Sequence, residues 1–120
     1  MAKMTEDVKK AIAEIGPAFV ATAGKDGSPN VSAKGSFRVL DDEHVVFADL
    51  FSPRTIANIK ENPRVAVIGL DAASRKGWRV QGQAEILTEG AVFESFSKEY
   101  ASKGKVKHVV KLKVEEAKAF

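Results

Sequence analysis

The segment VVFADLFSPRTIANIKENPRVAV, residues 45–67, carries the signals for two strands and the helix between them. Ser52 is a good helix N-cap, and Pro53 suits the first helical position, where its missing N–H costs nothing. Asn62-Pro63 ends the helix. The segment therefore predicts a strand at 44–50, a helix at 53–61 and a strand at 64–70.

Alternation and turn signals extend this pattern in both directions along the chain. Gly35 is a possible bulge in the strand before residue 44, and Trp78 and Val80 share one face of a later strand. About six strands joined mostly by tight turns favour a mainly β, antiparallel sheet that closes into a small barrel with short helices. The remaining predicted elements are a helix at 5–15 capped by Thr5, strands at 18–23 and 30–40, a strand at 77–88, a helix at 90–101 and a strand at 106–114.

The composition fits one globular domain over residues 1–120, with an apolar fraction of 44%. No apolar run is long enough to span a bilayer, and Met1 to Asp7 lead into an amphipathic stretch rather than the apolar core of a signal peptide. We therefore expect a cytoplasmic protein. The sequence has no cysteine, which removes disulfide and thiolate chemistry from consideration.

The net charge of +3 is mild, and much of the excess lies in lysines near the end of the sequence. A basic stripe between Lys105 and Lys113 could bind nucleic acid or an anionic ligand. Lysines that protect a solvated edge strand would produce the same pattern. Only Trp78 and Tyr100 could stack on bases besides phenylalanine, and neither interleaves with this stripe, so nucleic acid is not the favoured partner.

The start of the helix at residue 53 is a candidate anion site. The backbone N–H groups of Arg54 and Thr55 have no partner within the helix, Arg54 adds a charged fork and Thr55 adds a hydroxyl. Together with Ser52 they could bind a phosphate. Ordinary capping, with Arg54 solvated, explains the same residues.

Small residues on a neighbouring strand add to this site. Ser32, Ala33 and Ser36 surround Lys34, and small side chains would expose backbone to a flat ligand that lies alongside. The strand before the helix ends at Ala48-Asp49-Leu50 close by. Relief of crowding inside a tight barrel is the alternative explanation for the small residues.

Across nearly its whole length the sequence resembles the small FMN-binding split barrels related to pyridoxamine 5'-phosphate oxidase. The resemblance runs from AFVATAGKDGSPNVSAKGSF (18–37), through residues 45–67, to GWRVQGQAEIL (77–87). The middle block carries the most specific pattern, a basic residue followed by threonine and then an Ala-Asn pair, here Arg54, Thr55, Ala57 and Asn58.

The resemblance implies an antiparallel six-stranded split barrel that forms a homodimer with FMN at the subunit interface. It implies that one strand lines the flavin through its backbone, that a second segment lies near the ring and ribityl chain, and that the helix start holds the phosphate. The partner subunit would supply residues of a later strand, among them Trp78, Arg79 or Gln81, although barrel packing explains Trp78 as well. The implied cofactor-binding residues are Ser32, Ala33, Lys34, Ala48, Asp49, Leu50, Ser52, Arg54, Thr55, Trp78 and Gln81.

The expected function is that of a small FMN-dependent oxidoreductase or electron carrier, because the flavin supplies the redox chemistry and the sequence shows no catalytic set. True pyridoxamine 5'-phosphate oxidases carry an arginine-containing tail that residues 115–120 do not match, so that activity is not expected. A non-enzymatic nucleic-acid-binding barrel, and the same barrel with a deazaflavin or haem, remain alternatives. His44 and His108 are the only histidines, so no metal site is expected; His108 fits a hydrogen-bonded core or interface histidine better than a catalytic base.

Overall fold

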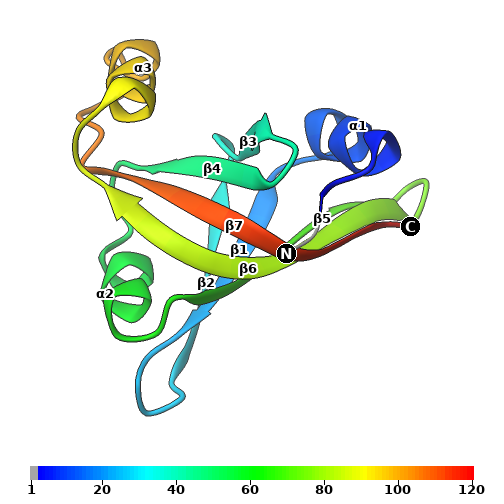
Figure 1. The fold of residues 1–120 in the computed structure, drawn as a ribbon, viewed down its shortest axis with the longest axis horizontal. Helices are drawn as coiled ribbons and strands as arrows, with labels where there is room; N and C mark the ends of the chain where they lie inside the picture. The colour runs from blue at the N-terminus through cyan, green and yellow to red at the C-terminus, as the bar shows by residue number, and fades with distance from the viewer. Residues whose placement is uncertain (1–2) are drawn as a thin grey trace.

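The computed structural model describes residues 3–120, which form three helices and seven strands (Figure 1). The helices are nine residues each, and none of those in the described range is long and apolar enough to cross a membrane. The elements are α1 (Glu6–Glu14), β1 (Ala18–Ala23), β2 (Pro29–Lys34), β3 (Arg38–Asp41), β4 (His44–Asp49), α2 (Pro53–Glu61), β5 (Arg64–Asp71), β6 (Lys76–Leu87), α3 (Ala91–Glu99) and β7 (His108–Ala119).

All seven strands belong to one curled sheet with the order β2-β1-β5-β6-β7-β4-β3. Every neighbouring pair is antiparallel, which confirms the predicted sheet type. The sheet is open, because β2 and β3 are its two edges and are not paired with one another. The mainly β architecture with short helices is therefore confirmed, as an open sheet rather than a closed barrel.

The predicted strand at 30–40 is wrong as a single element, and this error accounts for the seventh strand. A turn at Gly35 and Ser36 divides it into β2 and β3. The hydroxyl of Ser36 accepts a hydrogen bond of 2.8 Å from the backbone N–H of Ala48, a buried contact that ties the turn to β4. The chain therefore leaves β2 at one edge of the sheet and crosses to the other edge, where β3 pairs with β4.

The interpretation of residues 106–114 as a solvated edge strand is also wrong. β7 lies between β6 and β4, and it extends to Ala119, well beyond the predicted end. Glu115 is an extra residue in this strand, because Gln81 faces Glu116 and Gly82 faces Val114. A Cβ on Gly82 would lie 2.0 Å from the carbonyl oxygen of Lys113. Glycine is therefore required at this position, where the backbones of β6 and β7 approach closely beside the extra residue.

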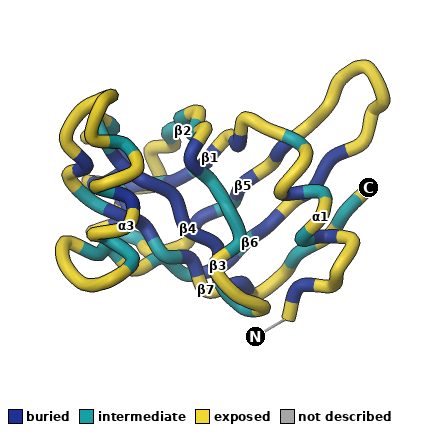
Figure 2. The backbone as a smooth tube through the Cα atoms, turned by 90° about the horizontal axis from the view of Figure 1, so that it is seen from above, coloured by how far each residue is buried: buried dark blue, intermediate teal, exposed yellow. Residues whose placement is uncertain are grey.

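Two apolar clusters hold the sheet together. The larger fills its interior and includes Phe47, Val80 and Leu112, all almost completely buried. The smaller lies under α3, where Phe96 packs against Val109 and other buried residues of β4 and β7. Figure 2 shows this distribution, with buried backbone in the strands and exposed backbone in the turns.

The helix α1 covers one end of the sheet, as its amphipathic spacing predicted. Val8 and Ile12 are its buried residues. Beneath it Trp78 is 1% exposed, stacks on Phe37 with ring centroids 5.0 Å apart, and donates its indole N–H to the carbonyl of Ile15 at 2.9 Å. The second helix, α2, lies at the opposite end of the molecule, beside β1 and β2 (Figure 1).

Candidate anion-binding site at the start of α2

Ser52 occupies the N-cap position of α2 and Pro53 the first helical position, as predicted. The Ser52 hydroxyl does not cap the helix, however. It donates to the Asp49 carboxylate at 2.6 Å and accepts a hydrogen bond of 2.7 Å from the Lys34 amine. The N–H groups of the first helical turn therefore receive no bond from this side chain, and Arg54 stands exposed beside them. This arrangement leaves backbone and guanidinium donors for an anion.

Asp49 is the centre of the polar cluster. It is 2% exposed, and its Oδ1 accepts hydrogen bonds from the Ser52 N–H and hydroxyl at 2.7 and 2.6 Å. Its Oδ2 accepts a hydrogen bond of 2.7 Å from Nδ1 of His108, which faces it across the β4–β7 pair. Burial raises the pKa of Asp49. The hydrogen bonds from Ser52 and His108 and the charge of Lys34 lower it by more, so the pKa of this carboxyl lies below its ordinary value. The carboxylate is thus held in its charged form.

Lys34 brings a half-buried amine to the same place from the end of β2. Its desolvation lowers the pKa of the amine, while the charge of Asp49 acts in the opposite direction. The cationic Lys34 and the anionic Asp49 are joined through the Ser52 hydroxyl. A further anion beside Lys34 would favour the charged amine in the same way.

Thr55 fastens α2 to β2. Its hydroxyl lies 2.9 Å from that of Ser32 and accepts a hydrogen bond of 3.2 Å from the Asn30 amide. The predicted proximity of the small-residue strand to the helix start is therefore confirmed. Because Thr55 is 1% exposed and its hydroxyl already has two partners, direct ligation of a phosphate by this hydroxyl stays a prediction.

Three other predicted residues flank this cluster without adding side chains to it. Ala48 is buried in the smaller apolar cluster, under α3, and Leu50 is partly buried against that apolar cluster. Ala33 is exposed and opposite Phe19 in the β1–β2 pair, on the face of β2 away from Ser32. A ligand near these residues would meet their backbone, as the resemblance implies for the flavin-lining segments.

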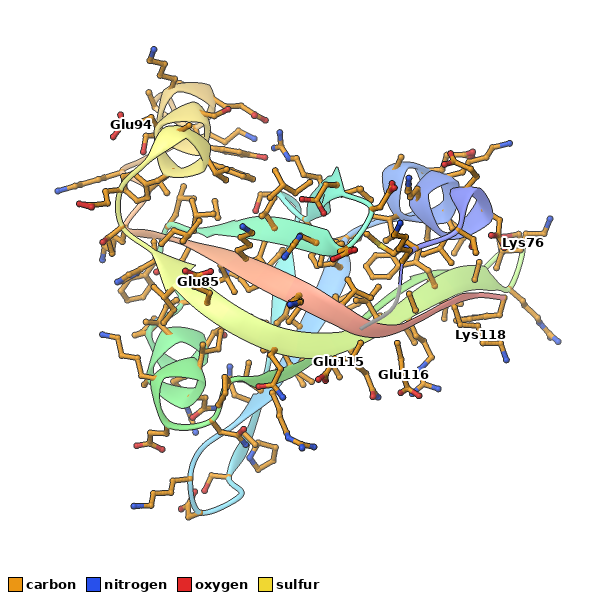
Figure 3. All side chains as sticks on the ribbon, in the orientation of Figure 1. Lys76, Glu85, Glu94, Glu115, Glu116 and Lys118 are labelled. Carbon is orange, nitrogen blue, oxygen red and sulfur yellow. The ribbon has the colours of Figure 1, made fainter. Side chains whose placement is uncertain are left out.

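Trp78 and Gln81 lie away from the cluster in this chain. Trp78 is enclosed in the core, as described above. Gln81 is on the outer side of β6, where a shallow groove of about 510 Å³ is also lined by Arg79 and by the exposed Glu115 and Glu116 (Figure 3). Their contribution to a partner subunit's site stays a prediction.

A second groove, of about 340 Å³, lies between α2 and the start of β7, and Asp49 and Ser52 are part of its lining. Phe51, Lys60 and Lys107 line it together with His108. Lys107 belongs to the predicted basic stripe between Lys105 and Lys113, whereas no sequence pattern singled out Phe51 or Lys60 as ligand-binding residues. The interpretation of His108 as a hydrogen-bonded histidine is confirmed by its bond to Asp49. Only the pairing of β4 with β7 brings these two residues together, and no local pattern signals that register.

Metal binding has no support from the side chains of residues 3–120. No group of three or more His, Asp or Glu residues in that range is arranged to hold a metal ion. The cluster at Asp49 contains one carboxylate and one imidazole whose facing atoms already bond to each other.

The sequence and the fold are both similar to those of known proteins. A family model described as pyridoxamine 5'-phosphate oxidase matches residues 4–120. An uncharacterised protein of Methanocaldococcus jannaschii, MJ0282, is 41% identical over 90 residues, which are 73% of this chain and 59% of that protein. The chain thus spans about three-fifths of this relative's length.

Solved structures agree with the family match over the full length. HupZ of Group A Streptococcus is 31% identical with a TM-score of 0.88, covering 98% of this chain and 94% of that one. An FMN-binding protein of Syntrophomonas wolfei has a TM-score of 0.85 at 18% identity, covering 95% and 84%, and shares the fold. The chain therefore belongs to the pyridoxamine 5'-phosphate oxidase family.

Proposed function

We propose that this protein is an FMN-binding flavoprotein that acts as a small oxidoreductase or electron-transfer protein. The observation that carries the proposal is the set of donors around the first turn of α2: the exposed Arg54, the Lys34 amine and N–H groups that the Ser52 side chain does not cap. A flavin phosphate carries about two negative charges, which these donors would neutralise. Membership of the family supports a flavin as the ligand.

The donor set fits a phosphate ester better than a neutral ligand. Arg54 and Lys34 would bind the phosphate, and the backbone of β2 from Ser32 to Lys34 would run beside the ring. Bound FMN would supply the electron transfer, while the chain orients it and limits the access of water. The charged Asp49 would keep Ser52 and His108 in place beside it.

A homodimer with FMN at the subunit interface is part of this proposal. Support comes from the outer face of β2, β1 and β5, where Phe19, Val31, Ile68 and Leu70 are exposed apolar side chains. Phe19 stands opposite Ile68 in the β1–β5 pair, so these side chains form a contiguous patch. Such a patch is typical of a protein–protein contact. A second copy would bring its own Arg79 and Gln81 near a shared site.

The test is the absorption spectrum and mass of whatever co-purifies with the protein, followed by titration with FMN. We expect a yellow protein that releases FMN on denaturation. A deazaflavin or haem in its place would show a different spectrum and mass. Protein that contains no flavin and takes up no added FMN would refute the proposal.

A substitution tests the site itself. Arg54→Gln should weaken FMN binding about ten-fold to a hundred-fold, because a charged hydrogen bond to the phosphate is lost. Arg75→Gln, in the turn between β5 and β6, is the matched control and should leave the affinity unchanged. Equal FMN affinity in the Arg54 variant and the control would show that the phosphate binds elsewhere.

A further inference from the structure

The end of α3 and the loop that leads to β7 are rich in exposed lysines. This segment, residues 98–107, has four lysines and one carboxylate, Glu99. Arg38 of β3 donates to both oxygens of that carboxylate at 2.8 Å, so a residue outside the segment neutralises it. None of the four lysine amines forms an ion pair with a carboxylate of residues 3–120. The segment therefore offers positive charge to a partner. The lysines are Lys98, Lys103, Lys105 and Lys107.

Phe51 places an apolar side chain beside these lysines. It is 78% exposed, more than the other large apolar side chains of residues 3–120. The Lys107 amine lies 5.0 Å from the centroid of its ring. A Cβ on Gly104 would lie 3.5 Å from Cδ2 of Leu50, so the lysine-rich loop packs beside the β4–α2 connection, as Figure 1 also shows. Phe51 and the four lysines are called the basic surface below.

The basic surface borders the proposed flavin site and is not a separate ligand pocket. The backbone N–H of Lys107 donates to the carbonyl of Asp49 at 2.9 Å. The Asp49 side chain in turn accepts a hydrogen bond from Ser52, the N-cap residue of α2. A protein that docked on Phe51 would therefore lie next to a flavin whose phosphate is bound at the start of α2.

A second copy of the chain does not fit the basic surface. The apolar patch that supports the proposed homodimer is on β1, β2 and β5, whereas Phe51 lies between β4 and α2. Two copies that met through the basic surface would bring like charges together, which disfavours association. Charge complementarity therefore favours an acidic partner.

The basic surface fits a protein better than a nucleic acid. The predicted lysine stripe is interrupted, because Lys111 is partly buried within β7 and stands opposite Glu85 of β6. Phe51 is the single aromatic residue of the basic surface, whereas single-stranded nucleic acids stack successive bases on several aromatic side chains. An apolar centre with a polar rim is typical of protein–protein contacts.

We propose that the basic surface docks an acidic protein, with an apolar side chain of that protein against Phe51 and its carboxylates against the lysines. The role of this partner rests on the proposed function: it is an electron carrier that reduces the bound flavin. Each electron that the partner's redox group loses is gained by the flavin, and water supplies the accompanying protons. Opposite charges speed the encounter, and a small interface lets the proteins separate afterwards.

The docking surface is tested by titration with probes of equal charge, followed by backbone amide NMR. The probes are a peptide of Glu-Glu-Leu repeats, a peptide of Glu-Glu-Ser repeats and oligothymidylate. We expect the leucine peptide to bind about five-fold or more tightly than the other two, because only it buries an apolar side chain on Phe51. The shifts should centre on residues 50–51 and 98–107. Tightest binding of oligothymidylate would overturn the proposal in favour of a nucleic acid, and shifts confined to other residues would overturn the assigned surface.

Variants separate the basic surface from the total charge of the protein. Combining Lys103→Gln, Lys105→Gln and Lys107→Gln should weaken binding of both peptides about ten-fold or more at low salt. Phe51→Ser should remove only the preference for the leucine peptide. Equal weakening in the control would overturn the assignment, and thermal denaturation checks each fold. The control combines Lys25→Gln, Lys76→Gln and Lys118→Gln, of which Lys76 and Lys118 lie at the end of the molecule opposite α3 (Figure 3).

The electron-carrier role has a separate readout. Reduced, FMN-loaded protein is mixed with ferricyanide, an anion that takes up one electron per molecule, or with neutral benzoquinone. The triple lysine variant should slow the reaction with ferricyanide about three-fold or more at low ionic strength and leave the reaction with benzoquinone unchanged. An unchanged ferricyanide rate would show that the lysines do not face the flavin, and would overturn this role.

The outcomes also separate this inference from the proposed function. Peptide binding at the basic surface of a protein that takes up no FMN would refute the flavin proposal and the electron-carrier role, while supporting the docking surface. FMN uptake without peptide binding at the basic surface would overturn the docking surface and leave the flavin proposal standing.

Discussion

The two ends of the sheet both bury a polar group, but the hydrogen-bond partners of these two groups differ in their exposure. At the α1 end, the indole N–H of Trp78 donates a hydrogen bond to a backbone carbonyl of the same chain, and Phe37 stacks on the ring. At the α2 end, Asp49 is just as deeply buried, but its partners Ser52 and His108 remain partly accessible and line a groove. Burial alone does not identify a site. The location of the remaining donors and acceptors does.

Removing the packing at the α1 end should have the largest effect on stability. Trp78→Ala should lower the free energy of unfolding by about 3–5 kcal/mol, because it leaves a cavity and an unpaired carbonyl at Ile15. Urea denaturation measures this loss. Trp78→Phe, which keeps an aromatic ring but not the N–H, should lose less. If Trp78→Ala lowers the free energy of unfolding by no more than a substitution at Asp49 does, the proposed difference between the two ends is wrong.

Substitutions at the α2 end should lower the stability of the protein less than Trp78→Ala does, and should weaken ligand binding more. Asp49→Ala leaves Ser52 and His108 without their acceptor and should cost about 1–3 kcal/mol of unfolding free energy, measured by urea denaturation. It should also weaken FMN binding, because the Ser52 and Lys34 side chains lose their fixed positions. Asp49→Asn, which retains one acceptor oxygen, is the control and should fall between wild type and alanine. A variant with unchanged FMN affinity would show that Asp49 has a purely structural role.

Sequence patterns were sufficient for most of the fold and for part of the site. Alternation located the strands, and Ser52-Pro53 located the start of α2, because these signals are local. The division at Gly35–Ser36 was missed, since the bond from Ala48 to the Ser36 hydroxyl joins residues that only the folded sheet brings together. The pairing of Asp49 with His108 depends on the register of β4 and β7 in the same way.

The contact between α2 and β2 should contribute a moderate stability. Thr55→Val keeps the shape of the side chain but removes the bonds to Ser32 and Asn30, so it should cost about 0.5–1.5 kcal/mol of unfolding free energy. Thr55→Ser keeps those bonds and serves as the control for the lost methyl group. Urea denaturation of the three proteins gives the comparison. A valine variant as stable as wild type would show that apolar packing alone holds the helix.

The smallest expected effect is the share of acid sensitivity that belongs to Asp49. Its pKa is lower in the folded protein than in the unfolded chain, where it is about 4. The stability it contributes is therefore present above about pH 4 and is lost as the pH falls through the lower folded value. Melting temperatures between pH 7 and pH 3 should fall less steeply at the acid end for Asp49→Asn than for wild type. Equal slopes would mean that Asp49 titrates alike in both states.

The position of β7 in the sheet also constrains the order in which the protein folds. Without β7 the remaining strands form two unconnected sets, β2-β1-β5-β6 and β4-β3, because no other strand bridges β6 and β4. A nascent chain that ends at α3 therefore lacks the strand that joins these two sets into one sheet. The polar centre at Asp49 is then also incomplete, since His108 has not yet emerged. We therefore expect the core to close and the site to be completed together, once β7 has joined the sheet.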